Sequence, residues 1–132
     1  MLKLERTYID EMIAHAREEL PNECCGIIAG TNGTAMKLYR ATNAAASPYR
    51  YEVDSRDLVR INNDAQDNDW EFLVIYHSHV ATEAFPSPTD RKLATYPEAY
   101  YLLVSLADQA NPVVRAFRIV DEQVEEQELQ VV

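Results

Sequence analysis

The sequence predicts an α/β fold in which a mixed β-sheet is flanked by helices. One observation is the order of the expected elements, which runs helix, strand hairpin, helix, strand, short helix and then further strands. A second is the continuous apolar run at residues 72–76, which is typical of a buried strand. A third is that no repeat, linker or low-complexity segment divides the 132 residues, so we expect one domain over 1–132.

The first expected helix covers residues 8–20. Apolar residues recur there at helical spacing, and Pro21 ends the pattern because it cannot continue a helix. His15 falls off the apolar stripe of this helix. We therefore expect His15 to be an exposed surface residue and not a ligand.

A hairpin and a second helix follow in the first half of the chain. Asn32-Gly33 is a strong signal for a two-residue turn that joins two antiparallel strands. Asp54 or Ser55 is expected to cap a helix that runs to about residue 67. The strands expected in this half cover residues 25–30, 34–42 and 49–53.

The second half is expected to hold the central strands and a short helix. Pro88 is typical of a first helical turn, and this helix is expected to run to about residue 95. Residues 123–132 alternate weakly and are acidic, so they form either an edge strand or a loose tail. The strands expected here cover residues 70–76, 100–106 and 113–120.

Two of the three histidines, His77 and His79, come directly after the expected central strand. Residues at i and i+2 of a strand point to the same face, so the two imidazoles would lie side by side. Imidazole suits zinc, a carboxylate can supply a third ligand, and Asp90 is the nearest candidate after the loop. Three protein ligands with a fourth position for water are typical of a catalytic zinc site.

A purely structural interpretation of the same loop is also open. Ser87 is a good N-cap, and Asp90 stands at the third helical position, where a capping-box partner belongs. Capping alone would account for both residues. The two interpretations are compatible, because a residue at a helix N-terminus can also face a metal.

The spacing His-x-His, seven residues, Ser, two residues, Asp, with an acidic residue upstream, resembles the signature of the JAMM (MPN+) zinc metallopeptidases. The residues that carry this resemblance are Glu23, His77, His79, Ser87 and Asp90. The stretches 22–26, 51–55 and 76–90 look most like the small bacterial branch of the family. Val80 stands where many members carry Pro, a departure that affects loop shape more than chemistry.

The resemblance implies a fold related to that of cytidine deaminases and one zinc ion per chain. The ion would be held by His77, His79 and Asp90 and would lower the pKa of its bound water to about 7. Glu23 would accept the proton of that water and later deliver it to the leaving amine. Ser87 would donate a hydrogen bond to the oxyanion, which can be worth roughly 3 kcal/mol.

The resemblance also implies a substrate, a ubiquitin-like sulfur-carrier protein. The expected reaction is hydrolysis of the bond after the C-terminal Gly-Gly of the carrier, with release of cysteine during cysteine biosynthesis. One alternative is an isopeptidase that removes such a carrier from lysines of target proteins. An alternative of another class is a non-catalytic MPN scaffold, against which the intact motif argues. Base deamination is disfavoured because its His-x-Glu and Pro-Cys-x-x-Cys signatures are absent.

Composition excludes other classes of function. The net charge of −10 argues against nucleic acid as a partner, and no apolar run approaches the length of a membrane span. The N-terminus has no apolar signal-peptide core, which favours the cytoplasm. Cys24 and Cys25 are the only cysteines and fit a reducing compartment. We expect them to be small apolar residues on a buried strand, although metal binding or oxidation sensing at the site is the alternative.

Overall fold

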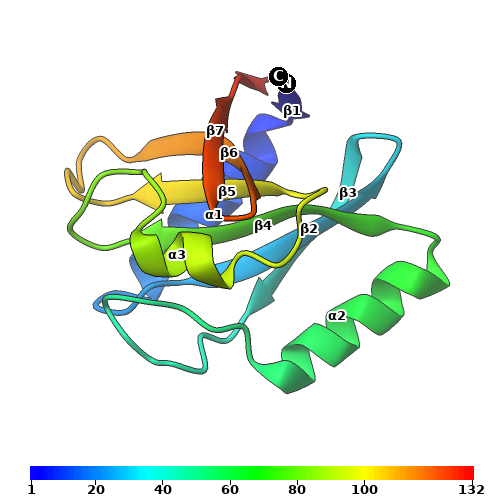
Figure 1. The fold of residues 1–132 in the computed structure, drawn as a ribbon, viewed down its shortest axis with the longest axis horizontal. Helices are drawn as coiled ribbons and strands as arrows, with labels where there is room; N and C mark the ends of the chain where they lie inside the picture. The colour runs from blue at the N-terminus through cyan, green and yellow to red at the C-terminus, as the bar shows by residue number, and fades with distance from the viewer.

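The centre of the fold is a six-stranded mixed sheet, seen in a computed structural model that describes residues 1–132 (Figure 1). The strand order is β3-β2-β4-β5-β6-β7, in which β4 and β5 are parallel and all other neighbours are antiparallel. The strands are β2 (Cys25–Thr31), β3 (Thr34–Ala41), β4 (Glu71–His79), β5 (Tyr100–Ser105), β6 (Val113–Val120) and β7 (Gln123–Gln127). The predicted mixed sheet is therefore confirmed.

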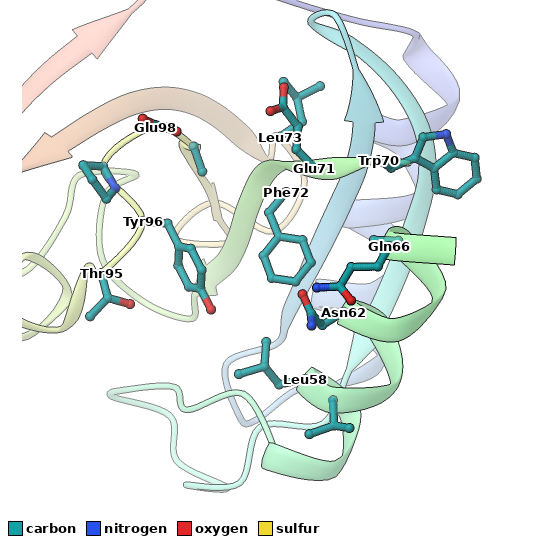
Figure 2. Close-up of a pocket in the computed structure, with 14 residues that line it drawn as sticks. Leu58, Asn62, Gln66, Trp70, Glu71, Phe72, Leu73, Thr95, Tyr96 and Glu98 are labelled. Carbon is teal, nitrogen blue, oxygen red and sulfur yellow. The ribbon is translucent and has the colours of Figure 1, made fainter. Parts of the chain in front are cut away.

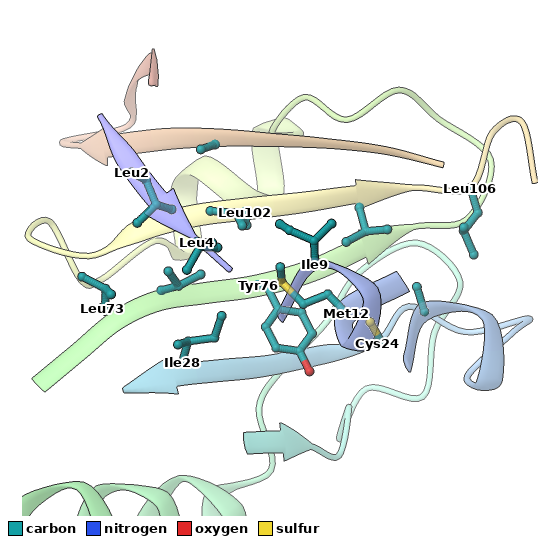
Figure 3. Packing of buried hydrophobic residues seen from close by; sticks show 14 residues of the cluster. Leu2, Leu4, Ile9, Met12, Cys24, Ile28, Leu73, Tyr76, Leu102 and Leu106 are labelled. Carbon is teal, nitrogen blue, oxygen red and sulfur yellow. The ribbon is translucent and has the colours of Figure 1, made fainter. Parts of the chain in front are cut away.

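Helices cover both faces of this sheet. The three helices are α1 (Arg6–Glu18), α2 (Ser55–Asp67) and α3 (Pro88–Leu93). On one face, α1 packs through Ile9 and Met12 against Tyr76 and Leu102 (Figure 3). On the other face, α2 packs through Ile61 and Ala65 into a second buried cluster. None of the helices combines the length and apolar character that crossing a membrane requires.

Strand β4 runs through the middle of the sheet and separates the two cores. Successive residues of a strand point to opposite faces, so Tyr76 joins the α1 cluster and Ile75 joins the α2 cluster. His77 has the same parity as Ile75 and therefore faces the α2 side. On strand β2, Gly26 lies opposite Tyr76. A larger residue would not fit there, because a Cβ at this position would lie 2.3 Å from the Tyr76 ring.

Several local predictions are confirmed. Asn32 and Gly33 both take positive φ (52° and 76°), as the two-residue hairpin turn requires, and join β2 to β3. The Asp54 side chain caps α2 by accepting hydrogen bonds from the main-chain N–H groups of Arg56 and Asp57. Within the last ten residues, β7 is an edge strand of the large sheet.

Two sheet predictions are wrong in extent. The strand expected at residues 49–53 is a loop with one isolated bridge between Asn43 and Val53, because the Asn43 side chain takes the hydrogen bonds that a strand partner would make. Strand β4 does not end at Tyr76 but continues to His79, since β2 and β5 flank it on both sides.

A small second sheet was not predicted. Strands β1 (Leu2–Leu4) and β8 (Leu129–Val131) form a parallel pair, so the two ends of the chain lie together (Figure 1). Leu2 and Leu4 are buried in the α1 cluster. Three-residue strands carry too little periodicity to be found from the sequence.

The prediction that His15 is exposed is wrong. His15 is buried, and its Nδ1 lies 2.8 Å from the hydroxyl oxygen of Tyr76, within hydrogen-bonding distance. The buried face of α1 is wider than its apolar residues alone indicate. His15 follows Met12 by three positions and so lies on the same face, and its buried ring nitrogen has a hydrogen-bond partner on β4. That partner lies 61 positions along the chain, so helical periodicity could not reveal it.

Candidate metal centre

Three side chains converge on one point at the end of β4. Nε2 of His79 lies 2.9 Å from Oδ2 of Asp90, and Nε2 of His77 lies 3.0 Å from the same oxygen. The three potential ligand atoms are all within 4.8 Å of one another, and all three residues are buried. The two rings lie edge to face, with centroids 5.2 Å apart, as expected for residues on one face of a strand.

A helix cap places Asp90 in this cluster. The Asp90 main-chain N–H donates to Oγ of Ser87 (3.1 Å), and the Ser87 main-chain N–H donates to Oδ2 of Asp90 (2.9 Å). These reciprocal bonds are the capping box of α3, with Pro88 in the first turn. The capping interpretation is therefore confirmed, and the capping oxygen is the same atom that meets the two histidines.

The imidazoles are arranged as metal ligands usually are. Nδ1 of His79 lies 2.8 Å from the carbonyl oxygen of Glu83, so Nδ1 carries the proton and Nε2 is left with a lone pair. Both ring nitrogens of the fully buried His77 lack a hydrogen-bond partner, although Nε2 lies close to Asp90. Orphaned buried nitrogens are rare unless an ion or another group completes them, so the site fits a metal ion.

The donor set fits zinc in particular. The cluster offers two neutral imidazole nitrogens and one carboxylate oxygen. Zinc accepts both kinds of ligand in the same site. A tetrahedral ion with bonds of about 2.0–2.1 Å separates its ligand atoms by roughly 3.3 Å, close to the 2.9 and 3.0 Å seen here.

The charges of the cluster are strongly coupled. Burial lowers the pKa of His77 despite the adjacent carboxylate. Burial also acts to lower the pKa of His79, but contacts with Asp90 and the Glu83 carbonyl outweigh it and raise that pKa. For Asp90, burial acts to raise the pKa, but the two adjacent histidines hold it far below its usual range. The carboxylate is thus ionised, as a metal ligand must be.

Glu23 reaches the site from the segment that precedes β2. Its neighbour Cys24 is fixed to β4, because the Cys24 N–H donates to Oγ of Ser78 (2.8 Å) and the Ser78 N–H donates to the Cys24 carbonyl (3.1 Å). The Glu23 side chain is only 3% exposed, and its Oε1 has no hydrogen-bond partner. Burial raises the pKa of Glu23 to about 8, with His79 close enough to lower it and Asp90 close enough to raise it.

The two cysteines are buried free thiols beside this segment. Burial raises the pKa of Cys24 and of Cys25 to about 12. A thiol with such a pKa is not a thiolate at neutral pH and is therefore a poor nucleophile and metal ligand. The interpretation of both as small apolar residues agrees with their burial.

Sequence reasoning did not identify Tyr51 as part of the site. Its ring stacks on the imidazole of His77, with centroids 4.3 Å apart and an interplanar angle of 22°. Tyr51 comes from the loop between β3 and α2, far from His77 in the sequence. The motif stretch 51–55 contains it, but nothing in that stretch indicates which side chain faces the metal centre.

A hollow of about 880 Å³ lies between α2 and the start of β4, and none of the candidate ligands lines it (Figure 2). Phe72 on β4 and Tyr96 face each other across it, with ring centroids 5.6 Å apart. Leu58 of α2 closes its lower end in the view of Figure 2. Most of its lining is apolar.

A second hollow of about 390 Å³ adjoins the first. The two share Leu58, Thr95 and Tyr96 in their linings. The smaller hollow is also lined by Tyr51, which stacks on His77.

The arrangement has the parts that hydrolysis of an amide requires. Three side chains can hold a metal ion, Glu23 is a buried carboxylate beside them, and Ser87 places a hydroxyl at the start of α3. All five residues that the sequence singled out for the site lie in the segments that converge here.

Comparison with known proteins gives a consistent result. Residues 5–120 match the family described as prokaryotic homologs of the JAB domain. The CysO-cysteine peptidase of Mycobacterium tuberculosis is 42% identical over 134 residues, covering 100% of this chain and 92% of that protein. The desampylase of Haloferax volcanii is 34% identical over 103 residues, covering 73% of this chain and 74% of that protein.

Solved structures show the same fold. The solution structure of a protein from Desulfitobacterium hafniense has a TM-score of 0.89 and 36% identity, covering 100% of this chain and 93% of that chain. A JAB1/MPN domain protein from Archaeoglobus fulgidus has a TM-score of 0.66 at 18% identity, covering 100% of this chain and 97% of that chain. The predicted mixed sheet flanked by helices is the fold of these proteins.

Proposed function

Because the chain belongs to the family of prokaryotic JAB-domain (JAMM/MPN) proteins, we propose that it is a zinc metallopeptidase acting on a ubiquitin-like sulfur-carrier protein. It hydrolyses the bond after the C-terminal Gly-Gly of the carrier and releases cysteine, as one step of cysteine biosynthesis. The observation that carries this proposal is the meeting of His77, His79 and Asp90 at one carboxylate oxygen, with ligand atoms 2.9–3.0 Å from it. Release of cysteine is supported by the name of the 42% identical relative.

One zinc ion per chain would be held by Nε2 of His77, Nε2 of His79 and Oδ2 of Asp90. When bound, zinc lowers the pKa of a coordinated water to about 7 and polarises the scissile carbonyl. The protein fixes the orientation of the ligands through the Glu83 carbonyl, the Tyr51 ring and the α3 capping box.

Glu23 moves the proton in this mechanism. It accepts a proton from the attacking water as the new C–O bond forms, and it donates that proton to the leaving nitrogen as the C–N bond breaks. The products are a carrier that ends in a Gly-Gly carboxylate and a free amine. A carboxylate can serve in both steps when its pKa lies near the working pH, and burial moves Glu23 in that direction.

Ser87 stabilises the oxyanion of the tetrahedral intermediate. Its Oγ accepts a hydrogen bond from the main-chain N–H of Asp90, which leaves the hydroxyl proton free to be donated to another acceptor. The capping bond fixes the position of that hydroxyl before the substrate arrives. A preorganised donor of this kind is worth roughly 3 kcal/mol.

The two hollows suit the docking of a carrier protein. The larger hollow is mostly apolar and suits a patch on a folded protein, and the smaller hollow is lined by Tyr51, whose ring stacks on His77. Glu71 and Glu98 line the larger hollow, so the docking face of the carrier is expected to have basic residues around an apolar patch. The overall charge of −10 favours such a partner and disfavours nucleic acid.

An isopeptidase that removes a carrier from lysines is the second candidate. It is favoured by the 34% identical relative that is named a desampylase. The two candidates share the metal centre and differ only in the group beyond the scissile bond. The intact ligand set disfavours the non-catalytic scaffold.

The proposed location is the cytoplasm, and residues 1–132 are proposed to act as one domain. The location is supported by two cysteines that are free thiols, as expected in a reducing compartment. The single domain is supported by two cores that share the central strand β4.

A competition between two substrates tests the choice of reaction. One substrate is a sulfur-carrier protein with cysteine after its Gly-Gly, and the other is the same carrier joined to a lysine side chain of a peptide. We expect the higher kcat/KM for the cysteine substrate. A higher value for the lysine conjugate would select the isopeptidase, and zinc-loaded protein that cleaves neither would contradict the peptidase function.

A further inference from the structure

We infer that Asn43 is a positioning residue that holds both Glu23 and Tyr51 at the metal centre. This inference rests on the proposed function, because it assigns Asn43 a task in the same reaction. Asn43 is 9% exposed and lies at the start of the loop between β3 and α2. Its side chain makes its four hydrogen bonds to main-chain groups of Glu23, Ala45, Arg50 and Glu52 and none to the candidate ligands or Ser87, so it acts through other residues.

The Asn43 side chain uses its full hydrogen-bonding capacity. Nδ2 donates to the carbonyl oxygens of Glu23 (3.1 Å) and Arg50 (3.0 Å). Oδ1 accepts the main-chain N–H groups of Ala45 and Glu52, both at 3.0 Å. A primary amide offers two donor protons and two acceptor lone pairs, and all four are used here. Among the other side chains, only glutamine offers the same set, and it is one methylene longer.

The first arm of this network reaches Glu23. The Glu23 carbonyl accepts from Asn43, and the Glu23 N–H donates to the carbonyl oxygen of Ser47 at 2.9 Å. Both main-chain groups of Glu23 are therefore bonded to the loop that Asn43 organises. Glu23 precedes β2 and has no ladder partner of its own. The loop, together with the bonds between Cys24 and Ser78, therefore sets the position of the Glu23 main chain.

The second arm reaches Tyr51. Asn43 bonds the carbonyl of Arg50 and the N–H of Glu52, the residues immediately before and after Tyr51. The main chain of Tyr51 is held from both sides by one amide. Its ring lies on His77, whose nitrogens have no other partner. The Asn43 amide therefore helps to position Glu23, which transfers the proton, and supports the orientation of the ligand His77 through Tyr51.

A purely structural role would be to close the loop, and it makes different predictions. If Asn43 only closes the loop, its removal lowers stability and affects activity only through the amount of folded protein. Removal of a positioning residue lowers kcat and zinc affinity in protein that remains folded. Groups that orient metal ligands typically contribute about 10–100-fold to metal affinity or activity.

The experiment measures zinc affinity, by competition with a chromophoric chelator, and kcat and KM at saturating zinc. The variants are Asn43→Ala, Tyr51→Leu and Glu23→Gln, with the two double variants that contain Asn43→Ala. Asn111→Ala is the matched control, because it also removes a hydrogen-bonding asparagine from a loop. Asn43→Ser, which keeps one donor and one acceptor, replaces Asn43→Ala if that protein does not fold.

We expect Asn43→Ala to lower kcat by about 10–100-fold with little change in KM, and to weaken zinc binding over the same range. Adding it to Glu23→Gln should not lower the residual rate further, and adding it to Tyr51→Leu should not weaken zinc further. Wild-type zinc affinity in Asn43→Ala, a wild-type kcat, or additive losses in either double variant would overturn the inference.

A failure of the proposed function gives a different result. If wild-type protein cleaves no carrier substrate, zinc affinity alone decides the role of Asn43. Non-additive zinc losses in Asn43→Ala and Tyr51→Leu would then support the positioning role while the substrate assignment fails. Unchanged zinc affinity in that case would overturn both.

Discussion

At the scale of single residues, Asp90 joins the architecture to the chemistry. Its Oδ2 accepts the main-chain N–H of Ser87 and lies within 3.0 Å of Nε2 of both His77 and His79. The capping box needs an acidic or amide side chain at this position, and the metal needs an ionised oxygen. One carboxylate meets both requirements, so the start of α3 positions a ligand without additional structure.

The role of Glu23 is tested by Glu23→Gln. The amide keeps the size of the side chain but cannot accept a proton, so we expect zinc to be retained and turnover to fall by about 10²–10⁴-fold. Zinc content and kcat are measured on the same preparation. Glu128→Gln, at an exposed glutamate, is the matched control and should keep wild-type turnover. Turnover near the wild-type level in Glu23→Gln would exclude the proton-transfer role.

Ser87 has two roles, and two substitutions separate them. Ser87→Ala removes both the cap and the hydroxyl, so we expect a loss of about 1 kcal/mol in stability and of about 10²–10³-fold in kcat. Ser87→Thr keeps both groups and should restore most of each. Urea unfolding and steady-state kinetics measure the two effects. If Ser87→Ala lost stability but kept kcat, only the capping role would remain.

At the scale of elements, the segments that carry the site were more predictable than the segments that support it. The helix start at α3 and the strand leading to His77 have strong local signals, and both are present. The loop at residues 49–53 was mistaken for a strand, because its order comes from the Asn43 side chain and not from a ladder. Contacts between distant parts of the chain, such as the stacking of Tyr51 on His77, leave no periodic pattern in the sequence.

The packing of α1 on β4 is tested by Tyr76→Phe. The change removes the hydroxyl next to Nδ1 of His15 and leaves that nitrogen buried without a partner. We expect a loss of about 1–3 kcal/mol in the free energy of unfolding, with zinc content unchanged. Tyr100→Phe removes an exposed hydroxyl that bonds a main-chain carbonyl and should cost less. Equal stability of Tyr76→Phe and wild-type protein would show that the buried contact contributes nothing.

At the scale of the whole molecule, the metal centre couples stability to pH. The buried Glu23 carboxyl, the two histidines and Asp90 lie together at the junction of the central strand with α3 and the segment before β2. Without a cation, the charged form of Glu23 is unfavourable in this place, and its pKa rises to about 8. A bound zinc ion would remove this disadvantage. The metal-free protein is therefore the form in which the coupling can be measured.

The metal-free protein should lose stability as the pH rises from about 5 to about 8. The folded state holds the Glu23 proton up to a pKa of about 8, whereas an ordinary glutamate releases it near 4.5, so the folded state binds more protons across this window. Stability then falls with rising pH by about 1–4 kcal/mol, since one pKa unit corresponds to about 1.4 kcal/mol. Urea unfolding in chelator at a series of pH values measures it.

The comparison that isolates Glu23 is the same series with Glu23→Gln. This variant should lack the part of the loss that comes from Glu23, while the contributions of the histidines and Asp90 remain in both proteins. The two stability curves should therefore diverge as the pH rises. Parallel curves from pH 5 to pH 8 would contradict the raised pKa of Glu23.

The most direct test of the peptidase function is intact mass spectrometry of a sulfur-carrier protein that ends in Gly-Gly-Cys, before and after incubation with the zinc-loaded protein. The same incubation with a chelator and with Glu23→Gln provides the controls. We expect loss of one cysteine residue from the carrier with wild-type protein, and an unchanged mass in both controls. An unchanged mass with zinc-loaded wild-type protein would contradict release of cysteine, and loss of cysteine in the presence of chelator would contradict the metal-dependent mechanism.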